Sequence, residues 1–155
     1  MYQLKRTQLI KSDLKTCWEF FSSPQNLKEI TPPYMGFDIK VSLPKEMYEG
    51  LMIAYTVRPL FFIPMTWITE IKTVKENQFF VDEQRKGPYT IWHHEHHFKE
   101  TPEGVEMTDI VTYVLPLGFL GRLVHPFIVK PKLQEIFEYR FKRVEEIFNK
   151  KELNS

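Results

Sequence analysis

The chain has 155 residues and a formal net charge of +1, from 21 basic and 20 acidic side chains. This length suits one domain with a core of its own. The balanced charge, without a basic stripe, argues against nucleic acid as a partner. No stretch approaches the roughly 20 apolar residues of a membrane span, and the first residues lack the apolar run of a signal peptide. We therefore expect a cytoplasmic protein.

Aromatic side chains make up 15% of the sequence, with thirteen Phe, seven Tyr and three Trp. Such side chains bury large areas, and they also line pockets for apolar ligands. The single cysteine, Cys17, has no partner for a disulfide within the chain or for a thiolate metal site. We interpret it as a small buried residue on a helix.

The first part of the chain predicts one strand and two short helices. Residues 2–10 alternate between two faces, as in a strand. A helix is predicted next, because Ser12 or Asp13 can cap its first turn and apolar residues then recur at three- and four-residue spacing. A second short helix is predicted after Ser23, which would cap it, with Pro24 in the first helical position.

Six strand-like segments follow, about ten residues apart and separated by turn signals. Connections this short join antiparallel neighbours, so the segments predict an antiparallel meander. With the first strand, the sheet would have seven strands. The segments are residues 36–43, 50–60, 64–74, 78–87, 89–100 and 104–116.

The last part of the chain predicts a long helix, because apolar residues recur at a 3.6-residue period after Pro131. From Pro131 to Lys150 this helix would measure about 30 Å, and Pro126 or Pro131 would begin or kink it. We expect residues 1–150 to form a single domain and 151–155 a flexible tail. The predicted fold is α+β: a curved seven-stranded antiparallel sheet wrapped around the long C-terminal helix, with two short helices between the first two strands. A cavity can remain between the sheet and the helix.

Four of the five histidines lie in the segment IWHHEHHF. Alternate side chains of a strand share a face. Because Trp92 and Phe98 are large and apolar, we expect their face to be the interior one and to carry His94 and His96. The other two histidines of the segment would then point outward.

The neighbouring strands supply acidic partners for these histidines. Pairing Lys99 with Glu106 across the turn places Asp109 opposite His96 and brings Tyr113 onto the same face. An Asp opposite a His in a half-buried sheet can form a hydrogen-bonded pair that fixes the imidazole tautomer.

Further polar residues can reach the same region. Asp82 and Gln84 share a face of the preceding strand, which brings them toward Trp92 and His94, although a one-residue slip would reverse this assignment. An inward Arg140 on the long helix would need an acidic partner, since an unpaired buried charge is costly. The Asp of either neighbouring strand can be that partner, and the pair would form the polar end of a pocket.

Three interpretations of this region are open. The polar side chains can form a network satisfied by Asp109, Gln84 and water, which is either structural or orients a bound ligand. His-x-His on a strand can also chelate a metal, with Asp109 or Asp82 as third ligand. A His–Asp pair can act in general acid–base chemistry on a bound carbonyl compound. We favour the first interpretation, and we expect no metal and no cofactor.

The sequence resembles bacterial members of the SRPBCC superfamily, the START-like, helix-grip group that includes polyketide cyclase/dehydrase-like proteins. The similar segments are FFVDEQRKGPYTIWHHEHHF, MTDIVTYVLPLGFLGRL, LQEIFEYRFKRVEEIF and SPQNLKEITPP, so the resemblance covers nearly the whole chain. It resembles an uncharacterised bacterial branch closely, at Asp82, Gln84, Gly87, Pro88, Trp92, His94, His96, Phe98, Asp109, Tyr113, Pro116 and Gly118. The resemblance implies a helix-grip fold with an internal cavity. It does not imply one reaction, because this fold hosts binders, carriers and enzymes.

The function that we expect is binding of a small, largely apolar ligand, lipid- or polyketide-like, in the internal cavity. The alternative is an enzyme of the cyclase, dehydratase or hydrolase type that uses His94 or His96 with Asp109 as an acid–base pair. The candidate ligand-binding residues are Trp92, His94, His96, Gln84, Asp82, Asp109, Tyr113, Phe137, Arg140 and Phe141.

Two apolar segments lie outside these candidate residues. The turn at 59–64, PLFFIP, can be a hairpin tucked against the core, a mobile lip over the cavity or a contact for a partner or a second copy. The segment around Leu117, Phe119 and Leu120 can be an ordinary lead-in to the long helix or a gate. We expect a monomer or a weak homodimer.

Overall fold

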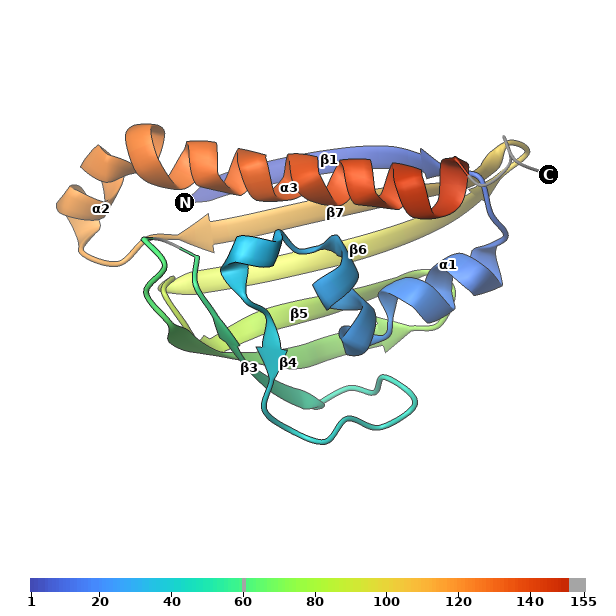
Figure 1. Ribbon diagram of the computed structural model, residues 1–155, viewed down its shortest axis with the longest axis horizontal. Coiled ribbons are helices and arrows are strands. Elements are labelled where there is room, and N and C mark those ends of the chain that lie inside the picture. Colours follow the sequence, from blue (N-terminus) through green and yellow to red (C-terminus); the bar gives the residue numbers. More distant parts are fainter. Residues whose placement is uncertain (60, 151–155) are drawn as a thin grey trace.

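The computed structural model describes residues 1–59 and 61–150, which form one curved antiparallel sheet with helices on it (Figure 1). The predicted tail, 151–155, lies outside the described residues. The strands are β1 (Tyr2–Ile10), β2 (Asp38–Ile39), β3 (Met52–Val57), β4 (Met65–Lys75), β5 (Phe79–Lys86), β6 (Ile91–Thr101) and β7 (Gly104–Val114). Their order in the sheet is β1-β7-β6-β5-β4-β3-β2. This confirms the predicted α+β, helix-grip architecture.

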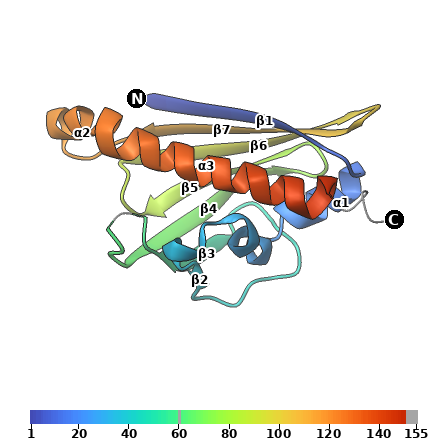
Figure 2. The same cartoon turned by 45° about the horizontal axis from the view of Figure 1, so that its top comes forward.

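The helical elements lie in two groups along the chain. Between β1 and β2 are α1 (Leu14–Phe21) and the 3₁₀ helices η1 (Pro24–Ile30) and η2 (Pro33–Met35). After β7 come α2 (Gly118–Val124), the π-helical turn η3 (His125–Val129), α3 (Lys130–Val144) and a second π-helical turn, η4 (Glu145–Asn149). Figures 1 and 2 show α3 running lengthwise along the sheet, with α2 at one end of the molecule and α1 toward the other.

Two apolar clusters hold the helices on the sheet. One joins β3, β4, β6 and β7 to α3 and includes Trp67, Trp92 and Phe137. The other packs α1 against the strands and against the last turns of α3, with Cys17 fully buried in it. Asp13 caps α1, since its Oδ1 accepts a hydrogen bond from the Thr16 amide at 2.9 Å. These contacts confirm the predicted cap and the buried cysteine.

The strand register is confirmed between β6 and β7. Lys99 pairs with Glu106 and His96 with Asp109, because the turn after Thr101 fixes the alignment of the two strands. Register shifts between β4 and β5, at Ile68/Thr69 and at Ile71/Thr73, mark bulges. Bulges bend a strand and increase its twist, which is how this sheet curves toward α3.

Three element predictions were wrong in extent or type. The expected strand at 36–43 is a strand only at Asp38–Ile39, because β2 is an edge strand that pairs with the end of β3 alone. The second short helix is a 3₁₀ helix, and Ser23 makes no side-chain cap bond. The helical run after β7 begins at Gly118 and not near Pro131. Pro126 and Pro131 lie within this run, in the first turns of η3 and α3, where a helix tolerates proline.

Candidate functional site

A cavity of about 160 Å³ lies between the sheet, α3 and the 3₁₀ segments. A single buried water needs only about 10–15 Å³, so this space accommodates several heavy atoms. Its walls are mainly apolar and aromatic, with Tyr55, Trp67, Trp92 and Phe137 among them. Pockets of this composition, with a few polar groups, are typical of small-molecule sites.

The polar wall of the cavity comes from β5, β6 and α3. His94 and His96 are only 4% and 6% exposed, and both line the cavity together with Asp82 and Arg140. The alternation of β6 turns these two imidazoles inward, as predicted. Asp109 of β7 is also buried and lies directly behind them.

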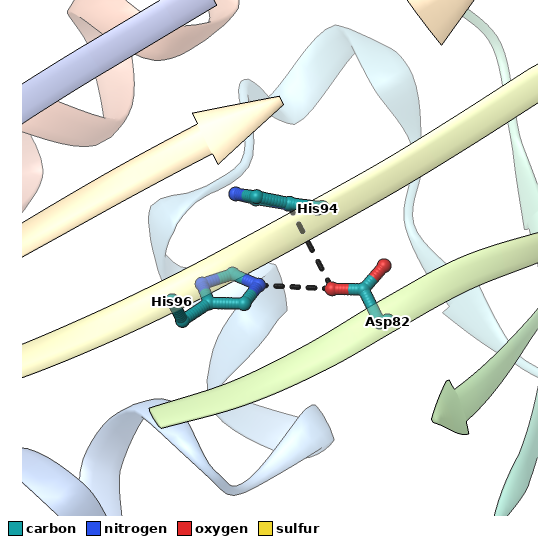
Figure 3. A group of neighbouring side chains, drawn as sticks. All are labelled: Asp82, His94 and His96. Atoms are coloured by element: carbon teal, nitrogen blue, oxygen red, sulfur yellow. Dashed lines mark hydrogen bonds and ion pairs between the residues drawn. The ribbon is translucent and has the colours of Figure 1, made fainter. Parts of the chain in front are cut away.

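Two carboxylates, Asp82 and Asp109, hold the two imidazoles, and Figure 3 shows the contacts of Asp82 with both rings. His96 Nε2 lies 2.9 Å from Asp82 Oδ2, and His94 Nδ1 lies 3.7 Å from the same oxygen. The other ring nitrogens face Asp109: His94 Nε2 is 2.9 Å and His96 Nδ1 is 3.0 Å from its Oδ1. The two rings are 3.8 Å apart between centroids. Each imidazole is therefore placed between one carboxylate on β5 and one on β7.

Arg140 completes the polar group from the helix side. Its Nη1 lies 3.5 Å from Asp109 Oδ1, and its guanidinium lies over the ring of Phe137 at 5.0 Å. This is the inward orientation that requires an acidic partner, and Asp109 is that partner. Two carboxylates and one guanidinium leave one negative charge, which a single protonated histidine neutralises.

The electrostatics of the site assign that proton to His96. Burial alone would lower the pKa of His96, but its contacts with Asp109 and Asp82 outweigh this effect and raise the pKa. Burial also lowers the pKa of His94, and the neighbouring charge of His96 lowers it further. The two pKa values are thus shifted in opposite directions, so His96 is the histidine that protonates first.

The carboxylates remain ionised in this environment. Burial opposes their charge, but the hydrogen bond from His94, the close approach of His96 and the Arg140 charge lower the pKa of Asp109 well below its usual value. The pKa of Asp82 is lowered as well, because the bond to His96 and the nearby positive charges outweigh its burial. With one proton added on His96, the site holds two anions, two cations and one neutral imidazole, which balances its charge.

Three buried nitrogens of residues in the cavity wall have no hydrogen-bond partner among the described residues. They are Trp67 Nε1, Arg140 Nε and His96 Nδ1, the last of which lies 3.0 Å from Asp109 Oδ1 without forming a hydrogen bond. Buried donors without partners are costly. A polar atom on a bound molecule would relieve that cost.

The same residues have the spacing of a metal site. Asp82, His94 and His96 each offer one ligand atom, and these atoms lie within 4.8 Å of one another. Asp109 contacts the ring nitrogens of His94 and His96 that face away from Asp82. Carboxylates in such positions commonly orient metal-binding histidines. A protonated His96 can supply the positive charge that a metal ion would supply here, however, and Arg140 already balances the negative charge of Asp109. The arrangement can hold a divalent cation without requiring one.

Four of the predicted ligand-binding residues lie outside the cavity wall: Asp109, which is behind the histidines, and Gln84, Tyr113 and Phe141. Gln84 closes the β5–β6 turn: its Nε2 donates to the Tyr89 carbonyl at 2.6 Å and its Oε1 accepts from the Tyr89 amide at 3.2 Å. The prediction that Gln84 satisfies the histidine network was therefore wrong, because the turn bends the amide back onto the backbone. The hydroxyl of Tyr113 bonds to His125 Nε2 at 2.7 Å, and Phe141 is half-buried beside Gln8 of β1.

Sequence reasoning missed several residues of the cavity. Tyr55 and Thr69 face it from β3 and β4, with their hydroxyl oxygens 3.1 Å apart. Burial raises the pKa of Tyr55 above its usual range, so the phenol stays protonated and can donate a hydrogen bond. A cavity was predicted between the sheet and the helix, but the sequence analysis did not assign Tyr55 or Thr69 to its wall.

Comparisons with known proteins support the fold. No family model and no curated protein matches the chain. Among solved structures, a protein from Mycobacterium smegmatis aligns at a TM-score of 0.69 and 16% identity, over 94% of this chain and 89% of the other. A protein from Thermus thermophilus aligns at a TM-score of 0.67 and 17% identity, over 94% and 95% of the two chains.

One structural neighbour has a stated biochemical context. It is the di-domain ARO/CYC StfQ from the steffimycin biosynthetic pathway, with a TM-score of 0.64 and 11% identity. The alignment covers 93% of this chain and 51% of StfQ. At these identities the similarity is one of fold, and this chain shares the helix-grip-like fold of a cyclase and of several bacterial proteins.

Proposed function

We propose that this protein binds a small, largely apolar molecule in its internal cavity, with a polar oxygen of that molecule against the histidine wall. The aromatic lining supplies apolar burial. Arg140 and a protonated His96 supply donors, so the recognised group is an acceptor such as a carbonyl, phenolate or carboxylate oxygen. The SRPBCC-like sequence pattern and the ARO/CYC neighbour support a polyketide- or lipid-like ligand.

The observation that carries this proposal is the buried Arg140 Nε with no partner among the described residues, at the wall of a cavity with apolar sides. A purely structural network would be expected to satisfy all of its members.

Binding can be measured with hydroxylated polycyclic aromatic compounds, through quenching of the buried Trp67 and Trp92. We expect Arg140→Met to weaken the binding of compounds that carry an acceptor oxygen by about tenfold or more, since a charged hydrogen bond contributes about 1.5–3 kcal/mol. Affinity for the matched hydrocarbon should not change. His97→Ala, on the outer face of β6, is the control. If no compound of either kind binds, the proposal fails.

A second candidate function, acid–base catalysis on an enolisable ketone, is favoured by the opposite protonation of two adjacent imidazoles. Sites that separate the pKa values of neighbouring groups often divide acid and base roles in this way. Neutral His94, oriented by Asp109, would remove a proton α to a carbonyl, while His96 and Arg140 stabilise the enolate oxygen. Exchange of α-protons for deuterium in a bound aromatic ketone tests this function. His94→Gln should abolish the exchange and His97→Gln should not.

A further inference from the structure

The end of the molecule that carries α2 exposes an unusual number of large apolar side chains. Phe61, Phe62, Leu117 and Phe127 are 74%, 71%, 77% and 80% exposed. We call the exposed hydrophobic residues of 61–63, 117–124 and 127–128 the apolar end. The exposure of Phe61 and Phe62 contradicts one interpretation of the turn at 59–64, that of a hairpin tucked against the core. Leu60 of the same turn lies outside the described residues.

The two parts of the apolar end lie together in space. A second cavity, of about 250 Å³, is lined by Pro59 and Met65 from the β3–β4 side, by Leu117 just before α2, and by Leu120 and Val124 of α2. Figure 1 shows this connection and α2 at the same end of the molecule. The exposed phenylalanines of the turn and the leucines of α2 therefore belong to one surface.

The helical part of this surface touches the rest of the protein through one narrow stripe. Gly121, His125 and Val129, spaced four residues apart, are buried, whereas Leu123 and Phe127 between them are exposed. A helix that is apolar on nearly every side is normally buried or placed in lipid. Here most of its apolar surface has no cover among the described residues.

The backbone holds some of these side chains outward at a cost. Phe61, Phe62 and Leu117 have φ values of 50°, 57° and 63°. Side-chain-bearing residues rarely adopt this left-handed region, and such strain tends to persist at functional sites. Three of the four side-chain-bearing residues with positive φ among the described residues are thus exposed apolar residues of this end of the molecule.

The chain segments that carry the apolar end contain cations and no acidic residue, and Glu135, which bonds to Tyr34 beside Phe62, is paired with Lys132. No Asp or Glu occurs at 50–69 or at 110–134, although the whole chain has 20 acidic residues. The cations Arg122 and Lys130 lie on the helical part and are exposed. Two copies docked through this face would bring like charges together, whereas an anionic lipid surface would pair with them.

We propose that the apolar end docks onto the surface of an anionic lipid bilayer. Phe61, Phe127 and the leucines of α2 would enter the interface, and Arg122 and Lys130 would contact lipid headgroups. Docking would lie in the plane of the membrane, and among the described residues no helix has the length and hydrophobicity to cross one. This proposal stands without the proposed ligand, although both cavities share Pro59, Tyr89 and Leu133 in their linings.

Flotation of the full chain with phosphatidylcholine vesicles, with and without phosphatidylserine, tests the proposal. We expect binding only when phosphatidylserine is present, and weaker binding at high salt. The double variant Phe119→Ser/Phe127→Ser should lose affinity about tenfold or more. Arg122→Gln/Lys130→Gln should lose about fivefold per cation. The matched controls, Tyr48→Ser and Lys99→Gln, change an exposed aromatic and an exposed cation elsewhere and should bind normally.

Circular dichroism and thermal melting of each variant separate lost docking from lost folding. The proposal is overturned if the wild-type chain ignores phosphatidylserine vesicles, or if the controls lose as much affinity as folded variants of the apolar end. It is also overturned if light scattering shows a wild-type dimer that the phenylalanine variants dissociate and the vesicles leave unchanged.

Discussion

The hydrogen bond between His94 Nε2 and Asp109 Oδ1, 2.9 Å long, runs diagonally across β6 and β7, because the residue directly opposite Asp109 is His96. Asp82 shows the same offset on the other side: it pairs with His94 in the register, yet its carboxylate accepts from His96. The crossed contacts couple all four side chains. A change at one of them should therefore alter the protonation of the others.

Removing Asp109 should destabilise the fold strongly. Asp109→Ala leaves Arg140 and the two histidines without their shared anion, and breaking a buried ion pair from one side typically costs about 3–5 kcal/mol. Urea unfolding measures the loss. Glu106→Ala, at an exposed position of the same strand, should change the free energy of unfolding by less than about 0.5 kcal/mol. Equal effects at the two positions would contradict the described network.

The pKa values of the two buried histidines should lie on opposite sides of about 6.5, the ordinary pKa of histidine. His96 has a raised pKa, so its contribution to stability is complete below about 6.5 and is lost as pH rises through the higher folded value. His94 has a lowered pKa, so its contribution is present above about 6.5 and is lost as pH falls through the folded value. Imidazole ¹⁵N chemical shifts, assigned with single His→Gln variants, measure both. Two identical titrations near 6.5 would rule out the assignment of the proton to His96.

Gln84 should matter for stability and not for ligand binding. Gln84→Ala leaves the amide and carbonyl of Tyr89 without their partners, at a cost of about 1–3 kcal/mol per buried group that stays unpaired. Ligand affinity in the quenching assay should stay at the wild-type value. Asp82→Asn, two residues earlier on the cavity wall, should instead change that affinity. If the Gln84→Ala protein were fully folded and still lost ligand affinity, Gln84 would belong to the binding site.

Cys17 should resist thiol reagents in the folded protein. Burial raises the pKa of its thiol to about 11, so little of the reactive thiolate exists at neutral pH, and the sulfur has no access to solvent. A disulfide reagent added at mild alkaline pH should label the native chain slowly and the urea-unfolded chain quickly. Fast labelling without denaturant would mean that α1 does not pack as described.

The sequence determined the sheet well because its signals there are local. Alternation around Trp92 and the short turn between Lys99 and Glu106 fixed both the inward face of β6 and its pairing with Asp109. The edge strand at 36–43 was overestimated, since propensity does not reveal that only Asp38–Ile39 finds a partner. The start of the final helical run was predicted too late, because a proline often marks the beginning of a helix. Here Pro126 and Pro131 lie within the run, in the first turns of η3 and α3.

The site was predicted less completely, because its contacts depend on side-chain directions that spacing does not give. The pairing of Asp82 with His96 is diagonal, and Gln84 turns back onto the β5–β6 turn. The cavity residues Tyr55 and Thr69 come from strands far from the histidine segment in the sequence. The protonation of His96 depends on the charges of Asp82, Asp109 and Arg140. This dependence could be recognised only in the structure, where these groups lie together.

Native mass spectrometry of the chain purified without organic solvent tests the central claim most directly. We expect the folded protein to retain a small organic molecule that is released on denaturation, and Arg140→Met to retain less of it than His97→Ala. A folded protein that carries no such molecule, and that takes up none from an extract of its expression host, would contradict a ligand-binding cavity.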